Sequence, residues 1–578
     1  MTRFADVFRF GIAVAMSCAA GPRPFTLRAP LVVDNDTRRV SIACRPEPSA
    51  KEPARARCAP EEYVSPFVWD QVDNLVFAPL SRALSIEVSG EAANATSLDE
   101  VADSSWFENR IGATPLSIEQ RTLGACKPED LLPDEVADGT WIVDHGKDNG
   151  STQGFRVDVP GKGIYMLKAD DAGVPERASA ASVIGAAIYN AAGFFTTCEQ
   201  VVLVGRAQLT LKPGLTTTSN AGITAPFDAA ALDAVLASST QVGGRTRMQA
   251  SKWLPGLPLG PFRYVGVRDD DPNDVIAHED RRELRGSRLL AAWINHWDAR
   301  EQNSMDLWLA DDVKQSRSSP GYVRHYIIDT SDTIGGGITS RAASLRLGKA
   351  YLVSLRDVML DFITFGALER PWDRARPVVG REKFGLFTVR DFDPEGWRGV
   401  YPNPAMERMT ERDGAWMARI IARFTADDIH AIAGSGQFSD PRDTEYLAQV
   451  LLDRQHAILV RYLTSLSPLS DVHPVGTDQL CAVDLARSSK LFPAERFHYR
   501  VVEIGAGRRI ELAVTPAPDG RVCFRPEPLA PGALPDDAVE RRVRFEIDNG
   551  TAAGPLEVHA YDLGTRGMFV VGLQRRAR

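Results

Sequence analysis

Alternating hydrophobic and polar positions predict three short β-strands from Thr140 onward, TWIVD, GFRVDV and IYMLKAD, separated by the glycine-rich segments HGKDNGSTQG and PGKG. A helix is expected next, between Pro175 and Gly193, because proline favours the first helical position and glycine the end. Its apolar face is formed by Ala181, Ile184, Ala187 and Ile188. A strand in EQVVLVGRAQLTL, a helix near 228–238 and a strand near 248–254 follow.

The second half of the chain predicts a helical region and then a β-rich tail. A helix over about 274–295 is basic in its first half and apolar in its second, and it leads into a predicted hairpin, MDLWLA and YVRHYII. Its arginines, Arg281, Arg282, Arg285 and Arg288, are interpreted as a solvated face paired with Glu279 and Glu283, with an acidic substrate as the alternative. Helical patterns dominate 345–365 and 414–466, and short alternating runs after Pro468 predict a β-sandwich-like domain.

Length and composition indicate a globular protein of two or three domains, because 578 residues exceed one ordinary hydrophobic core. A net charge of −9 does not indicate a broad basic surface, so nucleic acid is not expected as a partner. No apolar run reaches the roughly 18 to 20 residues that span a bilayer.

The first residues resemble a secretory signal with a lipoprotein cleavage box. Arg3 and Arg9 precede a short apolar run that ends in small residues before Cys18, the expected site of a lipid anchor. We therefore expect export, to the cell envelope as a lipoprotein or to the periplasm or medium, and membrane contact only through that anchor. A buried start of the first domain is the alternative.

The remaining cysteines suit disulfides in an oxidising compartment. They group as Cys44 with Cys58, Cys126 with Cys198, and Cys481 with Cys523. The last pair brackets the β-rich tail, so its Cα atoms are expected roughly 4.4 to 6.8 Å apart. No two cysteines have the spacing of a structural zinc site.

Candidate chemistry is concentrated between Asn295 and Gly337. Asp298 and Asn303 are five positions apart in one loop, and the predicted hairpin returns the chain to Asp329, which opens DTSDTIGGG. Phosphoryl transfer needs one carboxylate to orient the attacking group, and an amide oxygen with a second carboxylate to hold magnesium. Both Asp and Asn are also common turn residues.

Together with the preceding helix and the tripeptide His296-Trp297-Asp298, this segment resembles the protein-kinase-like superfamily, closest to its HipA-like and phosphoinositide-kinase-like branches. The resemblance implies ATP and Mg²⁺ as cofactors, Asp298 as the catalytic carboxylate, and Asn303 and Asp329 as metal ligands. It departs from the family at Trp297 and at Thr330-Ser331, and Asp332 is a rival metal ligand.

The same resemblance assigns Lys168, in IYMLKAD, to the nucleotide phosphates. The residues Ile164 and Met166 share its strand face and are expected to be buried, where a lysine needs an anion. Glu176 is the best candidate for its carboxylate partner, although a glutamate also suits a helix N-terminus. Gly150, Ser151, Thr152 and Gly154 are candidate phosphate-binding loop residues, with a plain hairpin loop as the alternative.

The predicted architecture is α+β, with a bilobal kinase-like domain over 136–468. A signal segment over 1–18 and a linker with an N-terminal extension over 19–135 precede it, and a β-rich domain over 469–578 follows. The expected function is ATP- and magnesium-dependent phosphoryl transfer to an acceptor, protein or small molecule, that the sequence does not identify. The alternatives are a nucleotide-binding pseudokinase or envelope-anchored interaction module, and a kinase-fold AMP transferase or ligase.

Overall fold

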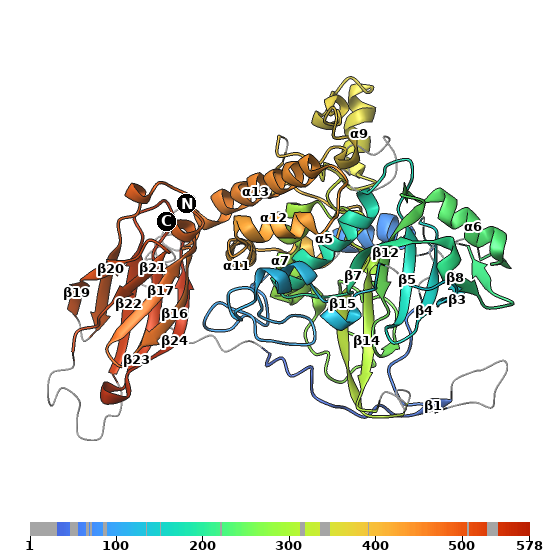
Figure 1. Cartoon of the computed structure of the whole chain (residues 1–578). Coiled ribbons are helices and arrows are strands. Elements are labelled where there is room, and N and C mark those ends of the chain that lie inside the picture. Colours follow the sequence, from blue (N-terminus) through green and yellow to red (C-terminus); the bar gives the residue numbers. More distant parts are fainter. Residues whose placement is uncertain are drawn as a thin grey trace, which may run out of the picture.

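The computed structural model describes residues 32–46, 56–64, 69, 72–84, 90–134, 136–148, 150, 152–219, 222–312, 318–335, 347–390, 392–505, 508–528 and 541–577. The predicted signal segment with Cys18, part of the linker, and Ser151 lie outside the described residues. The fold is α+β, as predicted, and its β-rich C-terminal part is reached through the long helix α13 (Pro441–Leu463) (Figure 1). Among the described residues, no helix is long and apolar enough to cross a membrane.

A seven-stranded sheet holds the three predicted strands at its centre. Its members are β3 (Trp141–Gly146), β4 (Gly154–Val159), β5 (Gly163–Ala169), β7 (Glu199–Val204), β8 (Leu209–Leu211), β11 (Gln241–Val242) and β12 (Arg245–Lys252). The order is β11-β12-β5-β4-β3-β8, and β7 also pairs with β12. The single strand predicted over EQVVLVGRAQLTL is therefore divided at Gly205, and its two parts join different neighbours.

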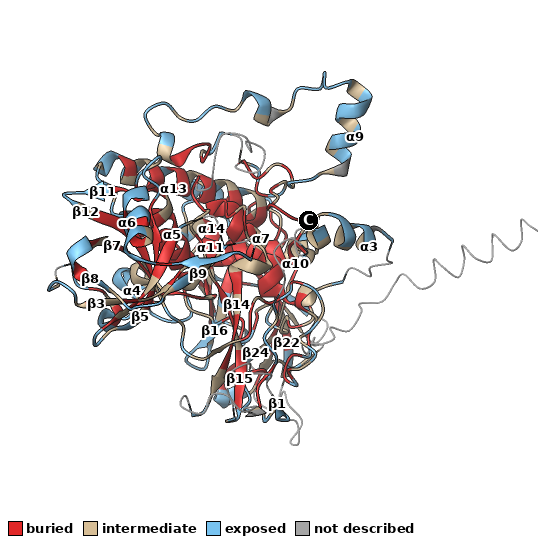
Figure 2. Cartoon of the chain, turned by 90° about the vertical axis from the view of Figure 1, so that its right-hand side faces the viewer, coloured by how far each residue is buried: buried red, intermediate tan, exposed pale blue. Residues whose placement is uncertain are grey.

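Helix α5 (Arg177–Ala192) packs on this sheet and is buried on all sides (Figure 2). It begins two residues after the predicted Pro175 and ends at Gly193, whose φ of 123° favours glycine. The Asp170 carboxylate caps its start by accepting from the Glu176 and Ser179 amides. Helix α6 (Ala229–Ser238) is capped by Asp228, as the predicted range suggested.

The predicted hairpin forms the centre of a second, four-stranded sheet. Its order is β13 (Leu257–Pro258), β14 (Ser304–Ala310), β15 (Gly321–Ile327) and β6 (Phe195–Thr196). Helix α7 (Arg282–Ile294) leads into β14; the predicted helix over 274–295 is shorter because His278–Asp280 form a 3-10 turn. A left-handed Asn295 ends α7 and directs the chain into His296.

The remaining helices cover α7 and α5. They are α10 (Pro404–Glu407), α11 (Glu411–Ile421), α12 (Ala426–Gly434) and α13, and their apolar faces form the largest hydrophobic core. Helix α9 (Leu355–Thr364) differs, because it projects from the body and its side chains are largely exposed (Figure 2).

The arginines at the start of α7 are buried, so the predicted solvated face is wrong for three of them. Arg281, Arg282 and Arg285 are 0 to 1% exposed. Arg281 pairs with Asp34 and Asp274, whereas Arg282 pairs with Asp99 and Asp413. The partners come from distant segments, including the N-terminal extension, and buried charges need such partners.

The C-terminal part is a β-sandwich, as predicted. One sheet has the order β16 (Leu469–Val475), β17 (Gln479–Asp484), β21 (Arg521–Phe524) and β20 (Val514–Pro516). The other has the order β19 (Arg508–Leu512), β18 (Arg500–Gly505), β22 (Arg541–Asp548), β23 (Leu556–Asp562) and β24 (Met568–Arg575). Cys481 and Cys523 are directly opposite on β17 and β21 and form the predicted disulfide, with Cα atoms 4.1 Å apart, just below the expected range.

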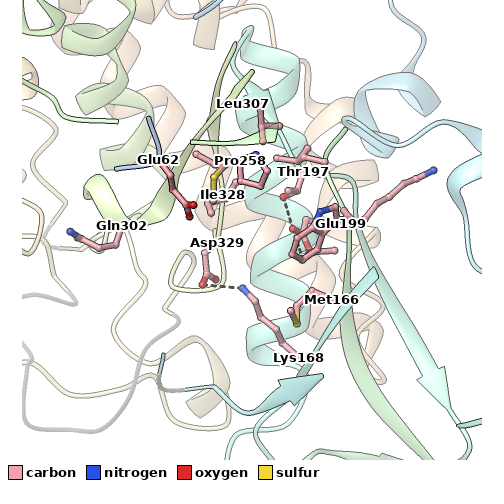
Figure 3. Close-up of a pocket in the computed structure, with 15 residues that line it drawn as sticks. Glu62, Met166, Lys168, Thr197, Glu199, Pro258, Gln302, Leu307, Ile328 and Asp329 are labelled. Carbon is pink, nitrogen blue, oxygen red and sulfur yellow. Dashed lines mark hydrogen bonds and ion pairs between the residues drawn. The ribbon is translucent and has the colours of Figure 1, made fainter. Parts of the chain in front are cut away.

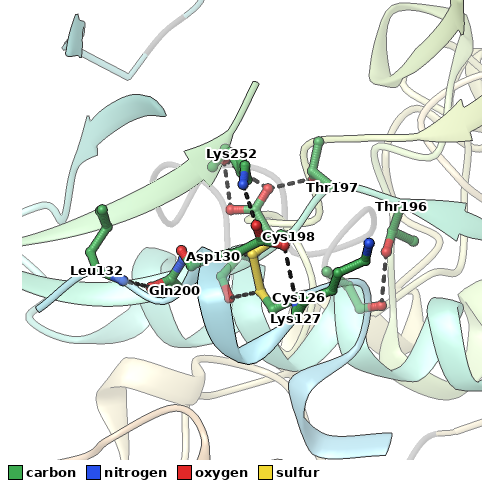
Figure 4. The surroundings of a disulfide bond; sticks show 12 residues. Cys126, Lys127, Asp130, Leu132, Thr196, Thr197, Cys198, Gln200 and Lys252 are labelled. Carbon is green, nitrogen blue, oxygen red and sulfur yellow. Dashed lines mark hydrogen bonds and ion pairs between the residues drawn. A yellow bond between two sulfur atoms is a disulfide. The ribbon is translucent and has the colours of Figure 1, made fainter. Parts of the chain in front are cut away.

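Buried apolar residues in the described part of the N-terminal extension, such as Ala59, Trp106 and Phe107, pack into cores shared with the central body. It contains the short strands β1 (Arg45–Pro46) and β2 (Ala56–Arg57) and the helices α3 (Ala78–Leu84) and α4 (Ile118–Leu123). The other two predicted cysteine pairs, Cys44–Cys58 and Cys126–Cys198, are also disulfide-bonded. The second bond joins the extension to the start of β7 (Figure 4).

Candidate active site

A cavity of about 440 Å³ lies between the seven-stranded sheet and the β14–β15 hairpin (Figure 3). Apolar side chains form two of its walls: Met166, Leu254, Pro258, Leu307 and Ile328. Polar side chains also line it, among them Lys168, Glu199, Asp329, Gln302 and Glu62. A cavity lined by apolar and by charged side chains suits a ligand with an apolar part and a charged part.

Lys168 and Asp329 meet in this cavity. The Lys168 Nζ atom lies 2.9 Å from Asp329 Oδ2, although Lys168 lies on β5 and Asp329 on the turn after β15, far away in the sequence. This contact agrees with the resemblance, which assigns both residues to one nucleotide site. Ile164 and Met166, on the same strand face as Lys168, were expected to be buried, but both are only half-buried. Met166 lines the cavity.

The turn that bears Asp329 is fixed against helix α5. Asp329 has a left-handed backbone with φ of 53°, a conformation that aspartate tolerates better than most residues. The Thr330 hydroxyl donates to the Ser182 carbonyl at 2.8 Å, and Thr333 donates to the Ala181 carbonyl at 3.0 Å. Gly185 allows this approach, since a Cβ atom there would lie 2.7 Å from the Thr330 Cβ.

Asp298 and Asn303 form a second pair beside this turn. The Asn303 amide nitrogen donates to the Asp298 carbonyl at 2.8 Å and to its carboxylate at 3.0 Å. The amide oxygen of Asn303 is then the atom suited to a cation. Arg300 Nε lies 2.9 Å from the other Asp298 oxygen. Neither Asp298 nor Asn303 lines the cavity itself.

The carboxylates of this loop have opposite pKa shifts. Burial opposes ionisation of Asp329, but Lys168 outweighs it and lowers the pKa to about 2. Burial raises the pKa of Asp298 to about 6, and Arg300 only partly offsets this. Burial, with Asp298 and Asp329 as like-charged neighbours, raises the pKa of Asp332 to about 8. Asp298 and Asp332 therefore share protons near neutral pH, whereas Asp329 stays ionised.

Glu199 replaces Glu176 as the second carboxylate near Lys168. Glu176 does not approach Lys168; it lies 2.6 Å from Lys383 and accepts from the Ser439 amide, which joins the start of α5 to the start of α13. Glu199, on β7, lines the cavity and accepts hydrogen bonds from the side chains of Thr197, Gln249 and Ser251. Its charge favours the protonated form of Lys168, against the cost of burial.

The glycine loop between β3 and β4 contributes through a lysine. Gly154 pairs directly with Lys168, and a Cβ atom there would lie 2.3 Å from the Leu167 carbonyl oxygen. Gly150 has a φ of 87°. Burial and the neighbouring Lys168 lower the pKa of Lys147 to about 8, so the loop brings a second cation near the site. Gly150, Thr152 and Gly154 do not line the cavity.

The extension contacts strand β7, which carries Glu199, next to the Cys126–Cys198 disulfide (Figure 4). The Cys126–Cys198 disulfide holds residues 127–132 against β7, where Gln200 donates to the Asp130 carbonyl and accepts from the Leu132 amide. Asp130 also pairs with Lys252, which lines the cavity. The wall that carries Glu199 is thus braced covalently and by polar contacts.

The oxygen donors fit a magnesium ion only in part. Within the described residues, no group of three or more His, Cys, Asp or Glu side chains could hold a metal ion. Asp329 and Asn303 offer one carboxylate and one amide oxygen, which is the small set that Mg²⁺ uses when phosphates complete its shell. The residues therefore fit a cation that arrives with a phosphorylated ligand.

Comparisons with known proteins do not place this chain. No family model matches it, no curated protein matches it, and no solved structure matches it. Its function is therefore argued from the site alone.

Glu199, Lys147 and Glu62 are among the residues at this site that sequence analysis did not find. Glu199 and Glu62 reach the site through contacts between segments distant in sequence. Only Lys147 had a signal, since it lies within the glycine-rich segment that was already singled out.

Proposed function

We propose that this protein is an ATP- and magnesium-dependent phosphotransferase with a kinase-like, bilobal domain. The observation that supports it best is the ion pair between Lys168, on the third strand of the sheet, and Asp329, on the turn after the hairpin. Asp298 and Asn303 lie beside that turn in the predicted order. In this proposal the seven-stranded sheet with α5 is the smaller lobe, and the helices around α7 belong to the larger one.

In this proposal each residue of the site has a separate role in phosphoryl transfer. Lys168 and Lys147 hold the phosphates, and the apolar walls around Met166 and Leu307 hold the base. Asp329 and Asn303 would hold magnesium, which when bound neutralises charge on the transferring phosphoryl group. Asp298 orients the acceptor hydroxyl and takes its proton, since a carboxylate with a pKa of about 6 is ionised at neutral pH yet able to bind a proton. Glu199 positions Lys168.

The test is binding and transfer with full-length protein. Magnesium-dependent ATP binding is measured by calorimetry, and transfer is followed with ATP labelled at the α- or the γ-phosphate over a panel of protein and small-molecule acceptors. Label transferred from the γ-position supports the proposal. Label transferred from the α-position supports AMP transfer instead, and absence of magnesium-dependent binding contradicts both.

A nucleotide-binding module without transfer is the second candidate. Three disulfides join described residues, and such bonds persist in oxidising compartments, where ATP is scarce. They support export of the protein as well. Binding without turnover on any acceptor, by protein with all three disulfides intact, would favour this candidate.

A further inference from the structure

The rim of the cavity is completed by a segment of the N-terminal extension. Residues 56–63, named the strap here, cross beside β13 and place Glu62 among the residues that line the cavity. Figure 3 shows the Glu62 carboxylate turned toward the side where Asp329 lies. Glu62 is an exposed residue, so it borders the opening and is not part of the buried wall.

Three kinds of contact hold the strap in place. The Cys44–Cys58 disulfide and the β1–β2 pairing tie the first residues of the strap to residues 44–46. The Tyr63 amide donates to the Leu259 carbonyl at 2.8 Å, and Gly260 lies so close that a Cβ atom there would be 2.0 Å from the Tyr63 oxygen. Ala59 is buried against Leu259, Trp308 and Val323.

The strap backbone is also anchored on the side away from the cavity. The Glu61 amide donates to Asp270, and Arg268 donates to the Glu61 carbonyl. The Glu61 side chain pairs with Arg45, and both Glu61 and Glu62 border a neighbouring cavity. Of these two adjacent glutamates, however, Glu62 alone lines the cavity that holds Lys168 and Asp329.

We infer that Glu62 is a selectivity residue of the site, held in place by the disulfide-closed strap, and that it disfavours a phosphorylated ligand alone relative to the same ligand with a divalent cation. The inference rests on the proposed function. A carboxylate at the rim repels a free polyphosphate, and it repels the complex less, because the cation has reduced the negative charge. Asp329, which lines the same cavity, acts in the same direction.

The experiment compares ATP affinity in excess magnesium and in EDTA, by calorimetry with full-length protein. Glu62→Gln should raise the affinity for metal-free ATP roughly three- to tenfold, the range expected for one charge near a surface. The gain from magnesium, defined as the ratio of ATP affinity in magnesium to ATP affinity in EDTA, should fall by a similar factor. Glu61→Gln, with the same change of charge on the next residue, should leave both affinities at the wild-type values.

The strap is tested by removing its disulfide. Cys44→Ser with Cys58→Ser should reduce the gain from magnesium toward the Glu62→Gln value, whereas Cys481→Ser with Cys523→Ser, in the β-sandwich, should not. Near-UV circular dichroism checks that the variants are folded. If the strap variant does not fold, the comparison of Glu62→Gln with Glu61→Gln decides alone.

The outcomes separate the two levels of inference. One outcome is that the wild-type protein binds ATP with magnesium dependence, but Glu62→Gln and Glu61→Gln have the same gain from magnesium. This result would overturn the role of Glu62 and leave the proposed function standing. Absence of magnesium-dependent binding by the wild-type protein would overturn both.

Discussion

Asp329 and the Asp298–Asp332 pair lie in one acidic loop region, yet they are in opposite electrostatic states. Asp329 faces Lys168 at 2.9 Å, and its pKa is lowered to about 2. The pKa values of Asp298 and Asp332 are raised to about 6 and 8. Burial raises the pKa of all three carboxyls; the contact with Lys168 outweighs burial at Asp329, Arg300 offsets it only in part at Asp298, and like-charged neighbours add to it at Asp332.

This difference assigns different tasks to the two sides. A carboxylate that stays ionised can bind a cation and oppose a lysine, whereas a carboxylate that titrates near neutral pH can accept a proton. If the assignment is right, substitutions on the Asp329 side should change ligand binding, and substitutions on the Asp298 side should change transfer or its pH dependence.

The largest effect is expected for Asp329→Ala. The change removes the one carboxylate that both pairs with Lys168 and is proposed to hold magnesium, so magnesium-dependent ATP binding should fall by on the order of 100-fold or more, about 2.8 kcal/mol. Transfer should fall with it. Asp478→Ala, at an exposed residue of the β-sandwich, is the control for loss of one carboxylate. Calorimetric affinity within a few-fold of wild type would contradict the assignment.

Asp298→Asn should separate transfer from binding. The asparagine keeps an oxygen for the Asn303 amide but cannot take a proton, so transfer should fall by roughly 10²- to 10⁴-fold. The Kd for ATP with magnesium should stay within about threefold, because Asp298 lies outside the cavity lining. Single-turnover kinetics at saturating ATP gives the rate. A parallel loss of binding would place Asp298 on the nucleotide side and remove the proposed division.

The candidate residues on the Asp329 side and on the Asp298 side could be predicted from the sequence, because short-range sequence patterns determine where they lie. Asp298 and Asn303 share one loop, a hairpin of recognisable pattern returns the chain to Asp329, and a lysine on an otherwise apolar strand face marks Lys168. The fold class, the β-sandwich and the disulfide pairs followed from patterns of the same kind.

The remaining contacts could not be predicted, because they join segments that no short-range pattern relates. Glu199 was missed and Glu176 was misplaced, since only the sheet order brings β7 near Lys168. The arginines of α7 have the periodicity of an exposed face. Their burial depends on partners such as Asp34, Asp99 and Asp413, which are supplied from segments far away in the sequence.

Gly185→Ala should affect the Asp329 side without changing charge. The added methyl would lie 2.7 Å from the Thr330 Cβ, so the turn must move away from α5. We expect a loss of about 1 to 3 kcal/mol in the free energy of unfolding, typical of overpacking, and weaker magnesium-dependent binding. Ala187→Gly, on the same helix, is the control for a changed helix propensity. The free energy of unfolding is measured with urea. A destabilised variant with unchanged ATP affinity would show that the position of the turn does not matter for the ligand.

The smallest effect is expected in the pH dependence of stability and of transfer. Because the pKa values of Asp298 and Asp332 are raised above the unfolded value of 3.8, the folded protein binds more protons than the unfolded chain between about pH 4 and 8. The free energy of unfolding in the absence of magnesium should therefore fall as pH rises through this range, by less than about 1.4 kcal/mol per pH unit for each group.

Asp332→Asn should make this decline shallower between pH 6 and 8, because one of the two titrating groups is gone. Transfer, which requires the ionised Asp298, should still begin to rise near pH 6, because Asp332 is protonated there and an asparagine can also donate the hydrogen bond by which Asp332 lowers the pKa of Asp298. Thermal unfolding and transfer are both recorded from pH 5 to 8.5, a range chosen around the expected transitions, with Asp361→Asn at the exposed helix α9 as the charge control. If Asp332→Asn left the stability profile unchanged between pH 6 and 8, Asp332 would not titrate in this range, and a large shift of the transfer profile would show that its charge acts on Asp298.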